Sequence, residues 1–200
     1  MPPYAAETLR VFLLDDHDLV RRGLRDVLAP ARDLQVVGDS ASARTGAQTI
    51  LRLDVDVMVL DLQLQDGTGI EVCRAVRAED PSVRGLLLTS AGDDEALAAS
   101  VLAGAAGYLV KLSNSIDVID AVRRVGAGRT ILDPAATAGA VAALRGRASR
   151  LDPPLTPDER GALDDVLAGR TDADVAARTG TTVAQASALV AGLVTRLTGR

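Results

Sequence analysis

Acidic, hydroxyl and amino side chains follow four separate apolar runs of the sequence. Asp15 and Asp16 follow the first run, Asp61 the second, Thr89 the third, and Lys111 follows a run that ends in Tyr-Leu-Val. If these runs are parallel strands, their carboxyl ends meet at one edge of a sheet, where open α/β proteins bind their ligands. Three acids, a hydroxyl and an ammonium would then converge on one ligand site.

The lysine of this set is the single lysine of the chain. The other 21 of the 22 basic residues are arginine. A planar guanidinium differs in shape and hydration from a compact ammonium on a flexible stem, so arginine is a poor substitute where an ammonium is needed. Retention of lysine at 111 alone therefore indicates a chemical role for Lys111.

Short apolar runs alternate with helical patterns through the first 128 residues. Runs rich in leucine or β-branched residues predict five strands, at 10–14, 34–37, 55–60, 84–88 and 108–110. Apolar residues that recur every three or four positions predict helices between them, at 18–29, 41–52, 68–79, 94–103 and 115–126. Strands that alternate with helices indicate an α/β fold with a doubly wound, five-stranded parallel sheet.

A second, all-α domain is expected after this alternation ends. A connecting helix is predicted at about 134–146, and prolines at 153 and 154 interrupt the chain. Thr156 with Glu159 then has the pattern of a capping box. Helices are predicted at 157–168, 172–178 and 182–197. The predicted organisation is a first domain at 8–128, a linker with its helix at 129–154 and a helical domain at 155–200.

Composition excludes several classes of protein. Hydrophobic residues make up 48% of the chain, which is sufficient for a globular core. The net charge of −5 argues against a nucleic-acid coat or a membrane-surface protein, so any DNA contact must be local. Cys73 is the only cysteine, which excludes an intramolecular disulfide and a cysteine-rich zinc site. With no apolar stretch long enough for a membrane span, a cytoplasmic protein is expected.

The ordered set of motifs resembles a known family. Residues 8–126 resemble the receiver domain of bacterial two-component response regulators, which has a flavodoxin-like fold. The resemblance rests on Leu-Leu-Asp-Asp-His at 13–17, Val-Leu-Asp at 59–61, Leu-Thr-Ser at 88–90 and Tyr-Leu-Val-Lys at 108–111. The whole chain resembles the NarL/FixJ group, whose output domain is a LuxR-type helix-turn-helix.

The resemblance implies a phosphorylated signalling protein that is not an enzyme, beyond Mg²⁺-dependent self-phosphotransfer and autodephosphorylation. Asp61 would accept a phosphoryl group from a sensor histidine kinase, and homodimers would form on phosphorylation. The implied Mg²⁺ ligands are Asp15, Asp16, Asp61 and the backbone carbonyl of Gln63. Lys111 and Thr89 would bind phosphate oxygens, and Thr89 with Tyr108 would carry the conformational switch.

The chemistry of these residue types supports the implied roles. A carboxylate is a competent nucleophile for forming an aspartyl phosphate. Its charge repels the phosphate of the donor, so a hard cation is needed to neutralise both groups. Mg²⁺ takes carboxylate, water and phosphate oxygens. His17 has no histidine or cysteine partner, so we assign it no role.

Two receiver positions depart from the common pattern. Gln65 stands where a proline often follows the phosphoacceptor, so we expect a looser loop there. Leu112 stands where many receivers have a proline after the lysine. Neither change removes an implied phosphate ligand.

Residues 155–199 resemble the LuxR-type helix-turn-helix without a gap. Such a domain binds DNA through its second helix, and Thr182, Gln185, Ser187 and Arg196 are the expected contacts. Residues 181–195 nevertheless include no charged side chain. From 151 to 200 the net charge is 5 − 7 = −2. The chain ends at Arg200, where the family has one further helix, so we expect an output domain that is degenerate and lacks its last helix.

Three functions therefore compete. The first is a transcription regulator that binds DNA. The second is a response regulator whose output domain acts by protein interaction or dimerisation, an alternative that the apolar positions 183, 186, 190, 193 and 197 would suit. The third is a phosphatase-like enzyme with an aspartate nucleophile on the first strand. That enzyme class needs a second aspartate two residues later, where this chain has His17.

Overall fold

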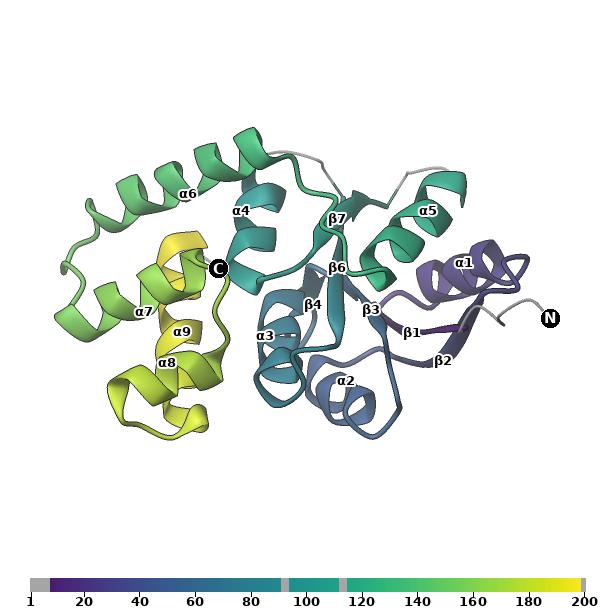
Figure 1. Cartoon of the computed structure of the whole chain (residues 1–200), viewed down its shortest axis with the longest axis horizontal. Coiled ribbons are helices and arrows are strands. Elements are labelled where there is room, and N and C mark those ends of the chain that lie inside the picture. The colour runs from purple at the N-terminus through teal and green to yellow at the C-terminus, as the bar shows by residue number, and fades with distance from the viewer. Residues whose placement is uncertain (1–7, 91–93, 112–114, 199–200) are drawn as a thin grey trace, which may run out of the picture.

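The chain folds into a receiver-like α/β unit followed by a group of helices (Figure 1). The computed structural model describes residues 8–90, 94–111 and 115–198 of the 200 residues. Two positions discussed from the sequence, Leu112 and Arg200, lie outside these described ranges.

A five-stranded parallel sheet forms the centre of the α/β unit. Its strands are β1 (Leu9–Leu14), β2 (Leu34–Ser40), β3 (Val57–Asp61), β6 (Arg84–Thr89) and β7 (Gly107–Val110). They lie in the order β2-β1-β3-β6-β7, and all neighbouring pairs are parallel. The predicted strands and fold class are confirmed. In this register Asp61 pairs with Leu88, and Thr89 pairs with Val110, so the carboxyl ends of three strands are level.

Helices cover both faces of the sheet because its strands are apolar on both sides. Val11, Leu13 and their neighbours pack against α1 (Asp18–Leu28) and α5 (Ser115–Gly126). Phe12 and Leu14 belong to the opposite core, with α2 (Ala43–Ile50), α3 (Gly69–Glu79) and α4 (Asp94–Ala103). Figure 1 shows α1 and α5 together on one side of the strands. The sheet is therefore doubly wound, as the alternation predicted.

A short hairpin follows Asp61. Strands β4 (Gln63–Leu64) and β5 (Gly67–Thr68) pair antiparallel, and Asp66 lies in the turn between them. The Asp66 carboxylate accepts hydrogen bonds from the Ala43 N–H at 2.8 Å and the Ser42 hydroxyl at 2.6 Å. These bonds fasten the turn to the start of α2. The structure thus shows a tied hairpin where Gln65 led us to expect a looser loop.

Close approach at Gly69 sets the position of α3 behind this hairpin. A Cβ atom at Gly69 would lie 2.3 Å from the backbone oxygen of Asp61. Only glycine allows this contact, so a larger residue would push α3 away from the end of β3.

The described residues after α5, up to 198, include four helices. They are α6 (Pro134–Ala148), α7 (Pro157–Leu167), α8 (Asp172–Thr179) and α9 (Val183–Thr198). The expected capping box of Thr156 and Glu159 is present at the start of α7. Of the predicted apolar positions in α9, residues 186, 190, 193 and 197 are buried, and Val183 is only partly buried. The predicted boundaries at 8–128, 129–154 and 155–200 remain predictions.

Helix α4 joins the two parts of the molecule. Its residues from Ala96 to Ala103 are all buried. The sheet covers one side of α4, and α3, α6, α7 and α9 contact the other sides. The apolar core is continuous from the sheet through α4 to α7, α8 and α9. Within the described ranges, every helix is too short or too polar to cross a membrane.

Candidate functional site

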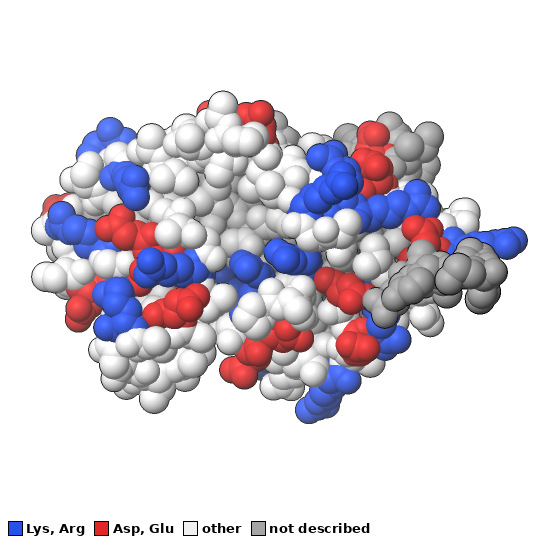
Figure 2. Space-filling model, in the orientation of Figure 1, with Lys and Arg blue, Asp and Glu red and all other residues white. Residues whose placement is uncertain are grey.

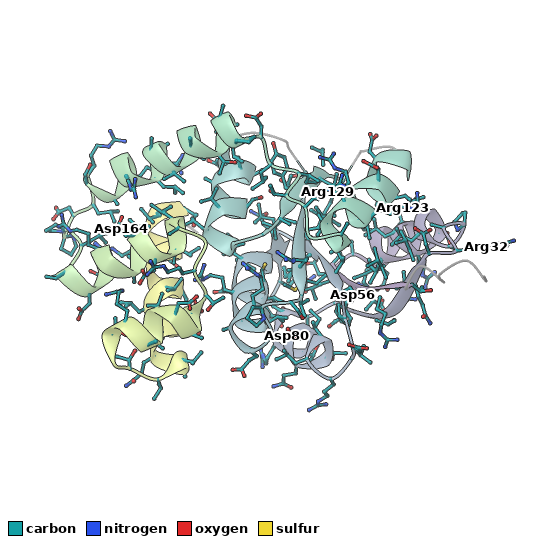
Figure 3. The ribbon with its side chains drawn as sticks, in the orientation of Figure 1. Arg32, Asp56, Asp80, Arg123, Arg129 and Asp164 are labelled. Atoms are coloured by element: carbon teal, nitrogen blue, oxygen red, sulfur yellow. The ribbon has the colours of Figure 1, made fainter. Side chains whose placement is uncertain are left out.

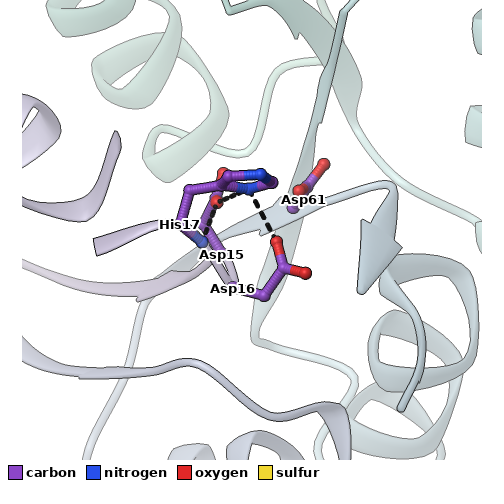
Figure 4. Close-up of side chains that lie close together, drawn as sticks. All are labelled: Asp15, Asp16, His17 and Asp61. Atoms are coloured by element: carbon purple, nitrogen blue, oxygen red, sulfur yellow. Dashed lines mark hydrogen bonds and ion pairs between the residues drawn. The ribbon is translucent and has the colours of Figure 1, made fainter. Parts of the chain in front are cut away.

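The acidic residues predicted from the strand ends lie together at the carboxyl edge of the sheet (Figure 4). Asp15 and Asp16 follow β1, and Asp61 ends β3. Together with His17, these residues offer ligand atoms that all lie within 4.8 Å of one another. Asp15 and Asp61 are buried, so their carboxylates lie in a site with little solvent.

Lys111 brings the only lysine of the chain into this cluster. Its Nζ atom lies 2.7 Å from Asp61 Oδ2 and 2.8 Å from Asp15 Oδ2. The backbone positions it, since the Lys111 N–H donates to the Thr89 carbonyl at 2.8 Å and so extends the β6–β7 ladder. One ammonium therefore bridges two buried carboxylates. The predicted convergence of these side chains is what the structure shows, and their chemical roles stay predictions.

The electrostatics of the site follow from burial and from this bridge. Burial raises the pKa of Asp61, and the negative charge of Asp15 adds to that effect, while the hydrogen bond from Lys111 opposes it. Burial acts to lower the pKa of Lys111, but the hydrogen bonds that its ammonium donates to Asp15 and Asp61, and the attraction of their negative charges, outweigh burial, so this pKa is raised. Lys111 is thus held as a cation between its two partners.

His17 closes the outer side of the acidic cluster. The backbone N–H of His17 donates to Asp15 Oδ1 at 2.8 Å. Its ring Nδ1 atom lies 2.7 Å from Asp16 Oδ1 and 3.2 Å from Asp15 Oδ1. Figure 4 shows the imidazole between the two carboxylates. His17 could not be assigned a role from the sequence, because a single histidine forms no motif with a second histidine or a cysteine. In the structure it braces Asp15 and Asp16.

The remaining predicted site residues lie around this cluster. Thr89 is buried at the end of β6. Tyr108 lies in β7 opposite Leu87, half-buried against the core that contains α4. Gln63 begins β4, and its N–H donates to Asp61 Oδ1 at 3.3 Å. Of these three residues, Gln63 makes a hydrogen bond to the carboxylate cluster, while Thr89 and Tyr108 lie on the two neighbouring strands β6 and β7.

The donor set fits a hard divalent cation. Asp15, Asp16 and Asp61 provide carboxylate oxygens, which Mg²⁺ prefers, and one histidine lies at the margin. Asp15 Oδ2 and Asp16 Oδ1 are buried, and their polar contacts are the ion pairs with Lys111 at 2.8 Å and with His17 at 2.7 Å. Both oxygens belong to the cluster that could hold the ion.

The residues expected to contact DNA lie on or beside α9. Thr182 and Gln185 form a reciprocal cap, in which the Thr182 N–H donates to Gln185 Oε1 at 3.0 Å and the Gln185 N–H donates to the Thr182 hydroxyl at 3.2 Å. Both residues are exposed, and Ser187 is half-buried. Arg196 instead pairs with Glu159 at 2.8 Å and donates to the Pro153 carbonyl. Its guanidinium is engaged within the helical domain.

Other arginines of the helical domain are also used internally. Buried Asp165 pairs with Arg170 at 2.9 Å and with Arg178. Of the described arginines from 155 to 198, Arg160 alone has no carboxylate within ion-pair distance. Figure 2 shows basic and acidic side chains intermixed on the visible face, without a continuous basic stripe over α7–α9. Few arginines of the helical domain are therefore available to bind DNA phosphates.

Comparison with known proteins identifies the first part of the chain. Residues 11–123 match the model of the response regulator receiver domain. The match contains the acidic cluster, Thr89 and Lys111, which are the residues that the fold brings together.

Relatives extend the similarity into the second part. The chain is 44% identical over 172 residues to the DNA-binding transcriptional activator DevR/DosR of Mycobacterium tuberculosis, covering 85% of this chain and 79% of that protein. A LuxR-family two-component response regulator from Aurantimonas sp. SI85-9A1 is similar in structure, with 31% identity, a TM-score of 0.60, and coverage of 70% of this chain and 99% of that one. Salmonella typhimurium RcsB, at 21% identity and a TM-score of 0.57, covers 96% of this chain and 92% of its own and shows the same fold. The chain therefore belongs to the response regulator family of two-component signalling proteins, with LuxR-type relatives.

Proposed function

We propose that the chain accepts a phosphoryl group on Asp61 from a sensor histidine kinase and regulates transcription through its helical output domain. The observation that carries the phosphorylation step is the Lys111 ammonium, 2.7 Å from Asp61 Oδ2. An ammonium at this distance can neutralise a phosphate oxygen once Asp61 is phosphorylated.

Mg²⁺ is the cofactor that fits this step. Asp15, Asp16, Asp61 and the backbone carbonyl of Gln63 would hold it. When bound, Mg²⁺ offsets the repulsion between the acceptor carboxylate and the donor phosphate. Asp61 supplies the attacking oxygen, the nitrogen–phosphorus bond of the kinase's phosphohistidine breaks, and the electron pair of that bond leaves on the imidazole nitrogen. The same site would support self-phosphotransfer from a small phosphodonor and slow hydrolysis of the aspartyl phosphate.

Thr89 and Tyr108 would convert phosphorylation into a change at α4. Thr89 ends β6, the strand that precedes α4 in the chain, and Tyr108 lies in the neighbouring strand β7, which contacts α4. Movement of the Thr89 hydroxyl towards the phosphate would free space for the ring. Since α4 contacts α6, α7 and α9, a shift there would reach the output helices and favour a homodimer.

DNA is the proposed target of the output domain. The relative named above is a DNA-binding transcriptional activator, and its similarity covers most of this chain. The NarL/FixJ arrangement, with α8 and α9 as the helix-turn-helix, agrees with the capped helices and the short turn at Gly180. Thr182, Gln185 and Ser187 lie at the start of the recognition helix α9, where side chains reach base edges.

A protein partner is the second candidate for the output domain. It is favoured by the ion pairs that hold Arg170, Arg178 and Arg196 inside the domain, because these pairs withdraw the groups that bind DNA phosphates.

Mobility-shift assays on pooled duplex DNA, with and without acetyl phosphate and Mg²⁺ at a stated salt concentration, separate these functions. A shift that depends on phosphorylation supports transcription control. If verified phosphorylation of Asp61 produces no shift, the output domain acts on a protein.

A further inference from the structure

A buried ion pair connects the receiver to the output helices. Arg74 lies on α3, and Asp172 is the first residue of α8, 98 positions along the chain. Arg74 Nε and Nη2 both donate to Asp172 Oδ1, at 2.8 and 2.6 Å. The two side chains are only 5% and 3% exposed. In most other ion pairs of the described residues, at least one of the two side chains is far more exposed to solvent. The Arg74–Asp172 pair is therefore unusual in having both side chains buried.

The same guanidinium also holds the end of α4. Arg74 Nη1 donates to the Leu102 carbonyl at 2.8 Å, and Nη2 reaches the Arg170 carbonyl at 3.2 Å. Leu102 lies in the last turn of α4, where backbone carbonyls have no partner within the helix. Arg74 therefore joins α3, the end of α4 and the start of α8 through one rigid, planar group.

The hydrogen bonds of Arg74 depend on the position of α4, because one of them goes to the Leu102 carbonyl. Apolar packing between the two parts of the molecule is non-directional and tolerates small shifts, whereas four hydrogen bonds on one guanidinium do not. If α4 moves when Thr89 responds to a phosphate, the Leu102 carbonyl leaves Arg74. A buried charge pair that loses supporting hydrogen bonds no longer offsets the cost of its desolvation.

We propose that the Arg74–Asp172 pair is an interdomain latch, which holds α8 against α3 in the unphosphorylated chain and opens when α4 shifts. The latch determines when the α8–α9 unit separates from the receiver. This inference rests on the proposed phosphorylation of Asp61, and it adds the residues through which α4 would release the output domain.

Distance measurement between spin labels tests the latch in the full chain. Labels at Arg32→Cys and Asp164→Cys report on domain separation, because these exposed residues lie on the receiver and the output helices, far apart in Figure 3. Burial raises the pKa of the Cys73 thiol to about 11, so the native cysteine stays protonated and does not compete for the label.

Two variants from opposite sides of the contact are compared with a surface pair. In the absence of a phosphodonor, Arg74→Gln and Asp172→Asn should each lengthen and broaden the label separation. The double variant should open no further than either single change, since both remove the same contact. Arg123→Gln, which breaks the exposed pair with Asp33 inside the receiver, should leave the separation unchanged.

Phosphoryl uptake is measured in the same samples. Uptake by the two variants shows that their receivers are folded. If both single variants keep the label separation of the parent, or if their effects add, the latch is wrong. Absence of uptake on Asp61 in the parent would instead overturn the proposed function, whatever the label separations show.

Discussion

Lys111 Nζ lies 2.7 Å from Asp61 Oδ2, and the same nitrogen lies 2.8 Å from Asp15 Oδ2. The Lys111 ammonium thus bridges Asp61, the proposed phosphoacceptor, and Asp15, a proposed metal ligand. After phosphorylation, the ammonium needs only a small movement along its flexible stem to pair with a phosphate oxygen.

Replacement of Lys111 by arginine should impair the site although the charge is kept. A planar guanidinium cannot occupy the space between two carboxylates that are each within 2.8 Å of one nitrogen. We expect the rate of phosphoryl uptake from acetyl phosphate to fall by about tenfold or more, as when a charge-stabilising donor is lost. Arg124→Lys on the exposed side of α5 is the matched control. A Lys111→Arg chain with the parent's uptake rate and DNA shift would refute the argument.

Asp61→Asn should raise the melting temperature at neutral pH in the presence of a chelator. Burial raises the pKa of Asp61, so the folded state binds this proton more tightly than the unfolded state does. Ionisation of Asp61 therefore costs folding free energy above its folded pKa and costs nothing below its unfolded pKa. The difference in melting temperature between Asn variant and parent should shrink as pH falls through the raised pKa towards 3.8, the ordinary value.

Asp33 is a control for which the expected change in melting temperature has the opposite sign. The hydrogen bond from Arg123 lowers the pKa of Asp33, so its ionised form stabilises the fold. Asp33→Asn should melt below the parent at neutral pH, and this deficit should vanish as pH falls below the ordinary range. Equal signs for Asp61→Asn and Asp33→Asn would contradict the electrostatic description of the site.

Mg²⁺ affinity should depend on Asp16 and not on a nearby exposed acid. Asp16→Asn removes a carboxylate from the cluster of Asp15, Asp16, His17 and Asp61. Calorimetric titration should show Mg²⁺ affinity reduced by more than about tenfold, since loss of groups that merely support metal ligands already costs this much. Asp18→Asn, whose side chain is exposed and pairs with Arg21, should bind Mg²⁺ as the parent does. Similar affinities in both variants would place the ion elsewhere.

DNA binding should depend only weakly on salt. Arg170, Arg178 and Arg196 are held by carboxylates within the output domain. Few phosphates can then be neutralised by one subunit, so the logarithm of affinity should fall with the logarithm of salt concentration with a slope of about −1 to −2 per subunit. A much steeper slope would mean that these ion pairs open on DNA.

The sequence predicted the sheet and its acidic edge because both follow from local patterns. Asp15, Asp61 and Lys111 each end an apolar run, and parallel strands must bring such ends together. The β4–β5 hairpin was not predicted, since strands of two residues are too short to show periodicity. The contacts of Asp66 with α2 that tie this hairpin could not be read from the turn residues alone.

Long-range polar contacts of the fold could also not be predicted from sequence patterns. Arg74 occupies a buried position between Cys73 and Val76, where a helical pattern would suggest an exposed charge, and its partner Asp172 is distant in the chain. The DNA contact expected of Arg196 stays a prediction, while its pair with Glu159 could not be predicted because it depends on how α7 and α9 pack. Such pairs are decided by tertiary structure and not by local spacing.

Mass spectrometry of the chain after incubation with acetyl phosphate and Mg²⁺, with the acyl phosphate trapped by reduction, tests whether Asp61 is the phosphoacceptor. We expect one modified residue, Asp61, no modification in Asp61→Asn, and none in the parent when Mg²⁺ is chelated. A phosphoryl group found on another residue, or undiminished uptake by Asp61→Asn, would show that Asp61 is not the acceptor.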